Sequence, residues 1–478
     1  MFRNKLYKST GAIMAIVLAY TACKAPALTT KEVNNKVPDS YGATHDTLNS
    51  GTVQWSTFFT DQNLRALIDT ALKNNQELNI TLQEIEITRN EVQARKGEYL
   101  PFVGIRGGAG VEKVGRYTSQ GAGDASTEIK PGKEMPEPLP DFLVGAYATW
   151  EVDIWHKLRN AKKAAVSRYL ASVEGRNFVI TNLIAEIANS YYELLALDNQ
   201  LDIVKQNIGI QQNALEIVKA QKEAARATEL AVRKFEAEVL NTQSLQFAIQ
   251  QQITETENRI NLLLARYPQP IVRDAQAFQK DRMGPVHAGL PAQLLVNRPD
   301  IRKAEMELAA SKLDIQVARA QFLPSVGISA SFGYNAFSPA YLLRTPESIL
   351  YSLVGDLMAP LVNKNAIKAN YYNANAKQTQ AIYQYERTIL NAYIEVANQL
   401  SNIGNLEKSY ALKAKQVEAL TQSIDISGDL FKSARADYME VLLTQRDALE
   451  SRFELVETQK QQMNALVNIY RALGGGWK

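Results

Sequence analysis

Four segments of the chain alternate between apolar residues and small or polar residues, a pattern typical of β-strands with two different faces. The clearest lies at about 324–335, where every second side chain is apolar. The same alternation predicts strands at about 101–112, 143–154 and 348–361. The apolar face of the predicted strands includes Val103, Ile105, Val326, Ile328 and Phe332.

Most of the remaining chain has helical periodicity. Residues 161–265 and 366–472 each predict a hairpin of two long helices. Residues 161–224 contain no proline, and a helix of these 64 residues would be about 96 Å long. Its apolar stripe consists of Ile180, Leu183, Ile184, Ile187 and Tyr191. Helices of this length need lateral neighbours to be stable.

The sequence also contains an internal duplication. YLPFVGI at 99–105 aligns with FLPSVGI at 322–328, and the match continues backwards without a gap. Further on, ARATEL at 225–230 matches ARADYM at 434–439. Self-similarity on this scale indicates a duplicated half, because solenoid repeats are far shorter. Each half is predicted to contain a helix, a β-hairpin and then two long helices.

The N-terminus has the pattern of an export signal. Basic residues precede the apolar run at 11–22, which is too short to span a bilayer as a helix. The only cysteine, Cys23, follows directly, at a position that resembles a bacterial lipoprotein cleavage site. That resemblance implies a diacylglycerol and an N-acyl chain on Cys23, although Tyr20 replaces the usual leucine. The alternative to an export signal is that residues 11–22 form an ordinary buried N-terminal segment.

These patterns together predict the organisation of the chain. The expected parts are a signal peptide at 1–22, a lipid-anchored segment at 23–60, a first repeat at 61–268, a linker at 269–296 and a second repeat at 297–478.

Composition and motifs argue against several classes of function. The chain is 46% hydrophobic and 22% charged, which is ordinary for a folded protein. A net charge of +3 gives no indication of nucleic-acid binding. The three histidines are far apart in sequence and no serine lies in a GxSxG motif. We therefore expect no catalytic site, no metal site and no cofactor apart from the lipid.

The solvent that faces the apolar side of the strands decides the fold class. Four strands cannot close a barrel, since about eight is the smallest number that works. An open sheet cannot lie in lipid either, because its edge backbone groups would have no hydrogen-bond partner. A lipid-facing sheet therefore needs several chains, and three would supply twelve strands. A soluble β-sandwich fits the alternation equally well, but the long helices and the exported N-terminus favour the membrane barrel.

Five blocks in order carry a resemblance to a known family: WEVDIWHKLR (150–159), YYELLALDNQLDI (191–203), RPDIRKAE (298–305), FLPSVGISASFGY (322–334) and YRALGGGW (470–477). Together they resemble the TolC-like outer-membrane efflux proteins, and most closely the lipoprotein channels of the NodT subfamily. The resemblance implies an α+β membrane protein that forms a homotrimer. Its twelve-stranded barrel would continue as a long α-helical barrel through the periplasm. The implied partners are a periplasmic adaptor and an inner-membrane transporter of the resistance-nodulation-division type.

The turns of the two helical hairpins are the candidate periplasmic gate. Related channels narrow there with acidic side chains, and rings of such side chains set ion selectivity. The candidates are Arg226, Glu229, Arg435, Asp437 and Glu440. Ala436 and Leu443 stand where relatives can carry aspartate. The alternative is that these charges are solvated turn residues, since exposed ion pairs contribute little.

The resulting hypothesis is a lipid-anchored exit duct of the outer membrane. It would passively conduct small toxic compounds, either drugs or metal ions, from an adaptor and pump. A duct for type I protein secretion is an alternative that the sequence does not separate from it. A lipidated coiled-coil scaffold without a channel is another, and it predicts strands without an apolar face.

Overall fold

The computed structural model describes residues 25–29, 31–41, 47–275, 278, 286–433 and 435–478. The chain forms two compact units. The first comprises Met1–Glu32, Glu86–Leu170 and Met306–Tyr383, and the second comprises Val33–Ile85, Ala171–Glu305 and Gln384–Lys478. Each unit therefore draws residues from both halves of the sequence.

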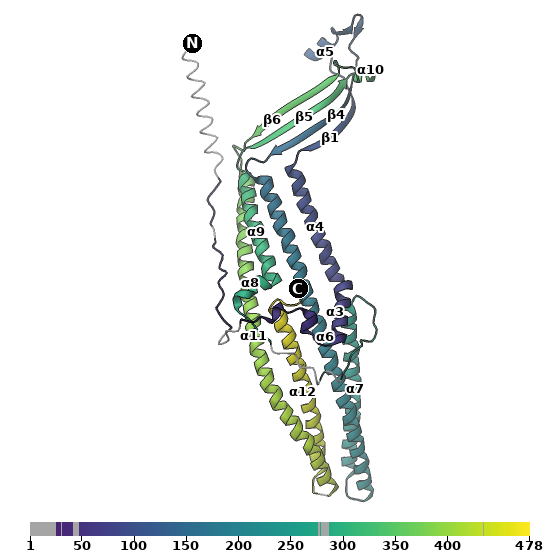
Figure 1. Ribbon diagram of the computed structural model, residues 1–478. Coiled ribbons are helices and arrows are strands. Elements are labelled where there is room, and N and C mark those ends of the chain that lie inside the picture. Colours follow the sequence, from purple (N-terminus) through teal and green to yellow (C-terminus); the bar gives the residue numbers. More distant parts are fainter. Residues whose placement is uncertain (1–24, 30, 42–46, 276–277, 279–285, 434) are drawn as a thin grey trace. The chain divides into compact units, whose positions relative to one another are not determined.

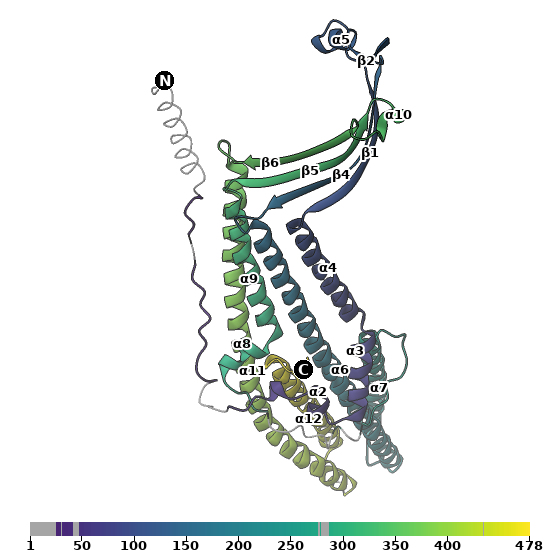
Figure 2. The same ribbon diagram turned by 45° about the horizontal axis from the view of Figure 1, so that its top comes forward.

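The first unit contains a four-stranded antiparallel sheet. Its strands are β1 (Phe102–Glu112), β4 (Leu139–Val152), β5 (Ser325–Ala336) and β6 (Ile349–Met358). They lie in the order β1-β4-β5-β6 (Figure 1), so β1 and β6 are edge strands with one neighbour each. Figure 2 shows the four strands curving together. Because neighbouring strands are antiparallel, the two edge strands run in opposite directions.

β4 begins earlier than the sequence pattern predicts. We expected a loop through residue 142, because four prolines lie close together there, but Pro140 belongs to β4. Pro140 pairs with Val111 of β1, whereas pairing with β5 starts only at Phe142. One side of Pro140 therefore has no strand neighbour, and proline is tolerated at such strand ends.

β4 also ends earlier than predicted, because the side chain of Asp153 caps the helix that follows. The Asp153 carboxylate accepts hydrogen bonds from the backbone N–H groups of Leu158 at 3.0 Å and Arg159 at 2.9 Å. It caps the start of α6 (Lys157–Glu223), whose first amides lack partners within the helix. Ile154, predicted as the last strand residue, therefore lies in the turn that follows Val152.

The two β-hairpin loops differ in length. The first contains α5 (Ser119–Asp124), β2 (Glu128–Lys130) and β3 (Lys133–Glu134), and the second contains α10 (Pro339–Leu342). There are 26 residues between β1 and β4 but 12 between β5 and β6. The offset between the halves is accordingly 223 before the loops (324 minus 101) and 209 after them (472 minus 263). The 14 residues lost equal the difference between the loops.

Helical segments adjoin the sheet in the first unit. They come from α4 (Gln76–Tyr99), α6, α9 (Pro299–Ala320) and α11 (Asn365–Lys432). A small apolar cluster joins Phe322 and Tyr371 to Ala25 and Leu28 of the N-terminal segment. No helix in the described part of the chain is long and apolar enough to cross a membrane.

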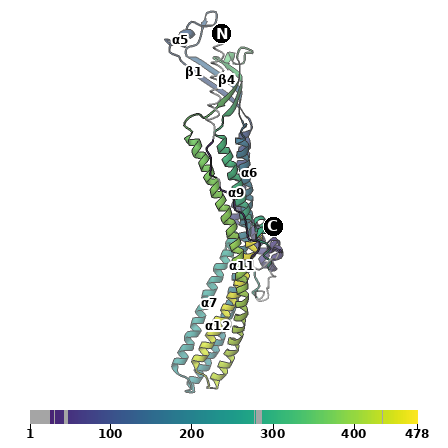
Figure 3. The same cartoon turned by 90° about the vertical axis from the view of Figure 1, so that its left-hand side faces the viewer.

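The second unit is helical. It holds η1 (Ser50–Thr52), α2 (Trp55–Phe58), α3 (Gln62–Asn74), α7 (Glu229–Leu263), η3 (Pro291–Gln293), α8 (Leu294–Asn297), α12 (Tyr438–Ala472) and the remaining parts of α4, α6, α9 and α11. The stripe predicted on α6 is buried throughout, from Ile180 to Tyr191. The Tyr191 hydroxyl donates to the Asp61 carboxylate at 2.7 Å, and Asp61 also caps α3. Figure 1 and Figure 3 both show α11 and α12 side by side as the two helices of one hairpin.

In each half a shorter helix precedes the helix that leads into the β-hairpin, and the sequence pattern did not predict these shorter helices. Asn75 separates α3 from α4, and Arg298 separates α8 from α9. The side chain of Asn75 donates to the Leu263 carbonyl at 2.9 Å, and that of Arg298 donates to the Ala472 carbonyl at 2.8 Å. Both contacts join equivalent positions of the duplicated halves, so different side chains make the same link.

Arg298 also centres a buried ion-pair network. Its guanidinium contacts Asp300 at 2.7 Å and Glu395 at 2.8 Å, and Arg471 contacts Glu395 at 2.7 Å. Burial alone would lower the pKa of Arg298, but the two carboxylates raise it above its ordinary value. With only 9% of its side chain exposed, Arg298 is held by these partners.

Replacing Arg298 with alanine should strongly destabilise the second unit. The substitution leaves Asp300 without its cation and leaves Glu395 with Arg471 alone. We expect it to lower the free energy of unfolding by about 3–5 kcal/mol. Arg89→Ala is the control, because Arg89 forms an exposed pair with Glu86 at 3.3 Å and should cost less than about 1 kcal/mol. Urea unfolding of the detergent-solubilised chain, followed by circular dichroism, measures both. Equal losses would contradict the prediction.

Candidate functional site: a two-faced sheet and two helical tips

The register of the sheet places its apolar residues on one face. Ile105 pairs with Ala146, Ala146 with Phe332 and Phe332 with Tyr351, so one row crosses all four strands. The five residues predicted on the apolar face share this side of the sheet, as do Ala148, Ala330 and Leu353. The face is therefore continuous across strands from both halves of the sequence.

This apolar face is uncovered in the chain. Ile105 is 84% exposed, Leu353 78% and Phe332 58%. Val326 and Ile328, on the central strand β5, are partly exposed. A sandwich would bury these residues against a second sheet, whereas here they form a large exposed apolar surface. Surfaces of this kind mark contact with a membrane or another protein.

The opposite face is smaller and more polar. Ser331 and Ser352 share a hydrogen bond at 2.7 Å, and Asn335 donates to the Asp141 carboxylate at 2.6 Å. At its centre a Cβ on Gly333 would lie 2.4 Å from the Val144 carbonyl oxygen, so only glycine fits. The sequence analysis did not include Leu350 and Val354 on this face, although their alternate positions in the 348–361 segment place them there.

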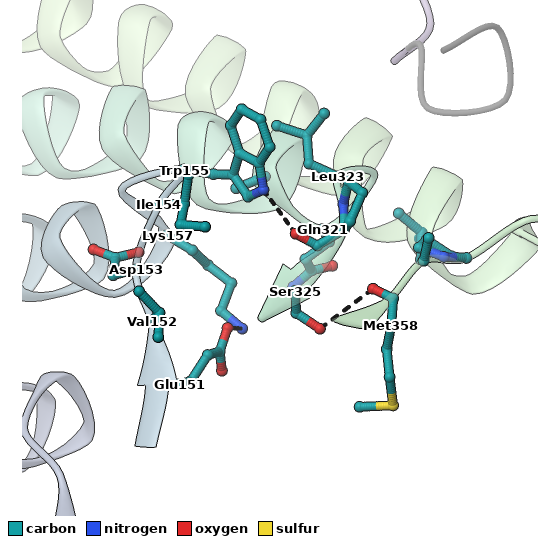
Figure 4. Close-up of a pocket in the computed structure, with 15 residues that line it drawn as sticks. Glu151, Val152, Asp153, Ile154, Trp155, Lys157, Gln321, Leu323, Ser325 and Met358 are labelled. Atoms are coloured by element: carbon teal, nitrogen blue, oxygen red, sulfur yellow. Dashed lines mark hydrogen bonds and ion pairs between the residues drawn. The ribbon is translucent and has the colours of Figure 1, made fainter. Parts of the chain in front are cut away.

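A cavity of about 500 Å³ lies where the strands meet the helices of the first unit (Figure 4). The Trp155 indole donates to the Pro324 carbonyl at 2.7 Å, and Lys157 pairs with Glu151 at 2.5 Å. Ser325 approaches the Met358 carbonyl at 3.5 Å. The Trp155 bond joins the segment after β4 to the segment before β5, and the Ser325 contact joins β5 to β6.

In the second unit, the structure brings the two candidate gate turns together. α6 ends at Glu223 and α7 begins at Glu229, while α11 ends at Lys432 and α12 begins at Tyr438. Val218 and Phe235 of the first hairpin form one buried cluster with Val441 of the second. We call the two turns with their flanking helix ends the helical tips.

Both helical tips use the same backbone turn. The Arg226 N–H donates to the Gln221 carbonyl, and the Arg435 N–H donates to the Leu430 carbonyl, each at 2.8 Å. This bond is characteristic of a Schellman helix end. Ala225 occupies the left-handed position of the first turn with φ of 57°, where glycine is more usual.

The five predicted gate residues differ in their contacts. Glu229 pairs with Lys222 across the turn and with Arg233 at 2.9 Å along α7. Lys222, and then Arg233, hold the pKa of Glu229 below its usual range. The sequence analysis missed both partners, although the four-residue spacing to Arg233 signals a helical ion pair.

The other four candidates are exposed. Within the described residues, no side-chain hydrogen bond or ion pair holds Arg226, Arg435, Asp437 or Glu440. Asp437 is the N-cap of α12 but makes no side-chain cap bond, whereas Thr228 caps α7 through the Ala231 N–H at 3.2 Å. The described residues also contain no group of three or more His, Cys, Asp or Glu that could hold a metal ion.

Comparison with known proteins identifies the family. The model of the family described as "Outer membrane efflux protein" matches residues 67–266 and 290–475. The chain belongs to the outer membrane efflux protein family. Members of this family are efflux channel proteins of the outer membrane, not enzymes.

Individual family members match over most of their length. The chain is 28% identical to the pyoverdine export outer membrane protein OpmQ of Pseudomonas aeruginosa, covering 89% of this chain and 88% of that protein. It is 26% identical to the cation efflux system protein CusC of Escherichia coli, with the same coverage. The structure of the open state of the Neisseria gonorrhoeae MtrE outer membrane channel superimposes with a TM-score of 0.81 at 23% identity, covering 95% and 99%. The fold is therefore that of TolC-like outer membrane channels.

The Glu229 pairs should weaken in acid. Because the pKa of Glu229 is lowered in the folded chain, its contribution is present above the ordinary glutamate pKa and is lost as pH falls through the lowered value. We expect amide exchange at the start of α7, corrected for intrinsic rates, to accelerate in that range. Glu229→Gln should remove this pH dependence. Glu223→Gln, an exposed control, should leave it intact, and an unchanged profile for Glu229→Gln would contradict the assignment.

Proposed function

We propose that this chain is the outer-membrane exit duct of a tripartite efflux system. It would passively conduct small toxic compounds from an adaptor and inner-membrane pump across the periplasm and outer membrane. The observation that carries the proposal is the sheet, because contact with lipid would account for its exposed apolar face and further copies of the chain would account for its two free edges.

The free edges argue for assembly with other copies. β1 and β6 each leave one row of backbone N–H and C=O groups without a strand neighbour. In lipid such groups cost several kcal/mol each, so the sheet must close. Since β1 and β6 run in opposite directions, β6 of one chain can pair antiparallel with β1 of the next. Three copies would form a twelve-stranded barrel, as the family resemblance implies.

The remaining parts of the proposal rest on the helices and the N-terminus. The helices of three chains would form the periplasmic tunnel, with the helical tips as the gate and the docking point for the adaptor. An inner-membrane transporter of the resistance-nodulation-division type would drive export. Cys23 and the signal peptide lie outside the described residues. Lipidation of Cys23 would anchor the chain beside Ala25, which packs on the Phe322 cluster in the first unit.

The proposal leaves the chemical class of the small compounds open. The relatives' names give pyoverdine for one and cations for another, so they do not choose between organic molecules and metal ions. A type I protein-secretion duct is the second candidate within the same architecture. A scaffold without a channel is less favoured, because a scaffold gives no reason for an apolar face across four strands.

Conductance in planar bilayers tests the proposal. The purified mature chain should behave as a trimer in detergent and produce discrete single-channel currents. A chain that stays monomeric, or a trimer that inserts without carrying current, would rule out the duct. Export of a toxic compound by cells that express the chain with its neighbouring adaptor and pump genes would then distinguish efflux from protein secretion.

A charge on the apolar face should prevent insertion. Phe332→Arg places a cation where we propose lipid, at a cost of about 2–4 kcal/mol near the bilayer midplane. Ser329→Arg is the matched control, because Ser329 lies on the opposite face of the same strand. We expect heat-stable trimer in membranes to fall sharply for Phe332→Arg but not for Ser329→Arg. Similar yields of both variants would show that the apolar face does not meet lipid.

A further inference from the structure

Arg106 is an isolated cation on the polar face of the sheet. It is the only basic residue in β1, β4, β5 and β6. Its side chain is exposed, and among the described residues it has no ion pair or hydrogen bond. It lies in the row that contains Gly145 and Gly333, so no side chain stands beside it on the two central strands.

The residues near Arg106 form a hollow with hydroxyl groups. A cavity of about 510 Å³ is lined on this face by Arg106, Tyr147, Ser331 and the glycine pair, together with Leu143 and Leu350. The Tyr147 ring lies over Gly104, which is two residues from Arg106 on the same face of β1. A Cβ added to Gly104 would be only 2.8 Å from that ring. Guanidinium and hydroxyl groups are the donors that bind carboxylate, phosphate or sulfonate oxygens.

Within one chain, the acidic residues of this face are too distant to neutralise Arg106. Asp141 lies four residues from Gly145 along β4, about 13 Å away, and it binds Asn335. Asp356 pairs with Gly327, six residues or about 20 Å from Gly333. Glu151 is equally distant and pairs with Lys157, and Glu112 lies six residues along β1. These separations exceed the screening length of about 8 Å at physiological ionic strength.

We propose that Arg106 forms a cationic ring inside the assembled barrel that attracts and transiently binds anionic groups of the cargo. This inference rests on the proposed function, because the ring needs three chains around one lumen. Twelve strands about 4.8 Å apart and tilted about 40° enclose a backbone circle of about 12 Å radius. Three inward arginine side chains bring their charges within a screening length of the axis. The ring favours organic cargo that carries a carboxylate, phosphate or sulfonate over free metal cations.

Reversal potentials across a potassium chloride gradient test the ring. At low salt the wild-type channel should pass more chloride, relative to potassium, than Arg106→Gln does, by about twofold or more. Arg106→Glu should shift the preference further towards potassium, and Arg106→Lys should retain the wild-type ratio. The differences should shrink at 1 M salt, where the screening length is about 3 Å. Arg89→Gln, which removes an exposed cation from α4, is the control and should leave the ratio unchanged.

The outcomes separate this inference from the proposed function. Wild type, Arg106→Gln and Arg106→Glu could all conduct normally with the same permeability ratio. That result would overturn the cationic ring but not the proposal that the chain is a duct. Absence of any current from wild-type trimer would overturn the duct, and the ring with it. If Arg106→Gln fails to assemble, the comparison of Arg106→Lys with Arg106→Glu decides the question.

Discussion

The need to satisfy backbone hydrogen bonds at the edges of the sheet governs the rest of the molecule. A four-stranded sheet that is apolar on one face has no stable place alone, since water disfavours the face and lipid disfavours the edges. The residues around Gly145 and Gly333 add a second constraint, because two strands approach so closely there that only glycine fits. The proposed pairing with further copies would meet the first constraint, whereas the glycine pair meets the second within one chain.

Duplication explains how one chain supplies strands and helices in matched sets. The positions of Asn75 and Arg298 correspond, and each side chain donates to a carbonyl near the end of the last helix of its half. In the first half the side-chain amide of Asn75 makes this bond. In the second half Arg298 makes it and also forms ion pairs with Asp300 and Glu395. The backbone link is thus preserved while its chemistry differs. This is expected when geometry, rather than a particular side chain, positions the helices.

Much of the fold could be predicted from periodicity, because strands and helices repeat with different periods. Alternation predicted the two faces of the sheet, and the long helices and the exported N-terminus favoured an exposed apolar face. The buried stripe of α6 followed from helical spacing. The errors lie where single residues override a pattern. Pro140 is accepted at a strand end, Asp153 ends β4 by capping α6, and Asn75 breaks a helix without glycine or proline. At the helical tips, the pairing of Glu229 with Lys222 depends on the turn geometry, which sequence spacing does not give.

The distribution of unpaired charge bears on where a duct would discriminate among solutes. At the helical tips Glu229 is neutralised by its own partners, and the exposed Arg226 and Arg435 offset Asp437 and Glu440. Equal numbers of opposite charges at one end of a duct project less field into a salt solution than a single uncompensated charge does. In the part of the chain that the structure describes, Arg106 has no such partner, and it lies beside the glycine pair, Tyr147 and Ser331. The helical tips would therefore restrict passage mainly through their width, while selection by charge would take place within the sheet.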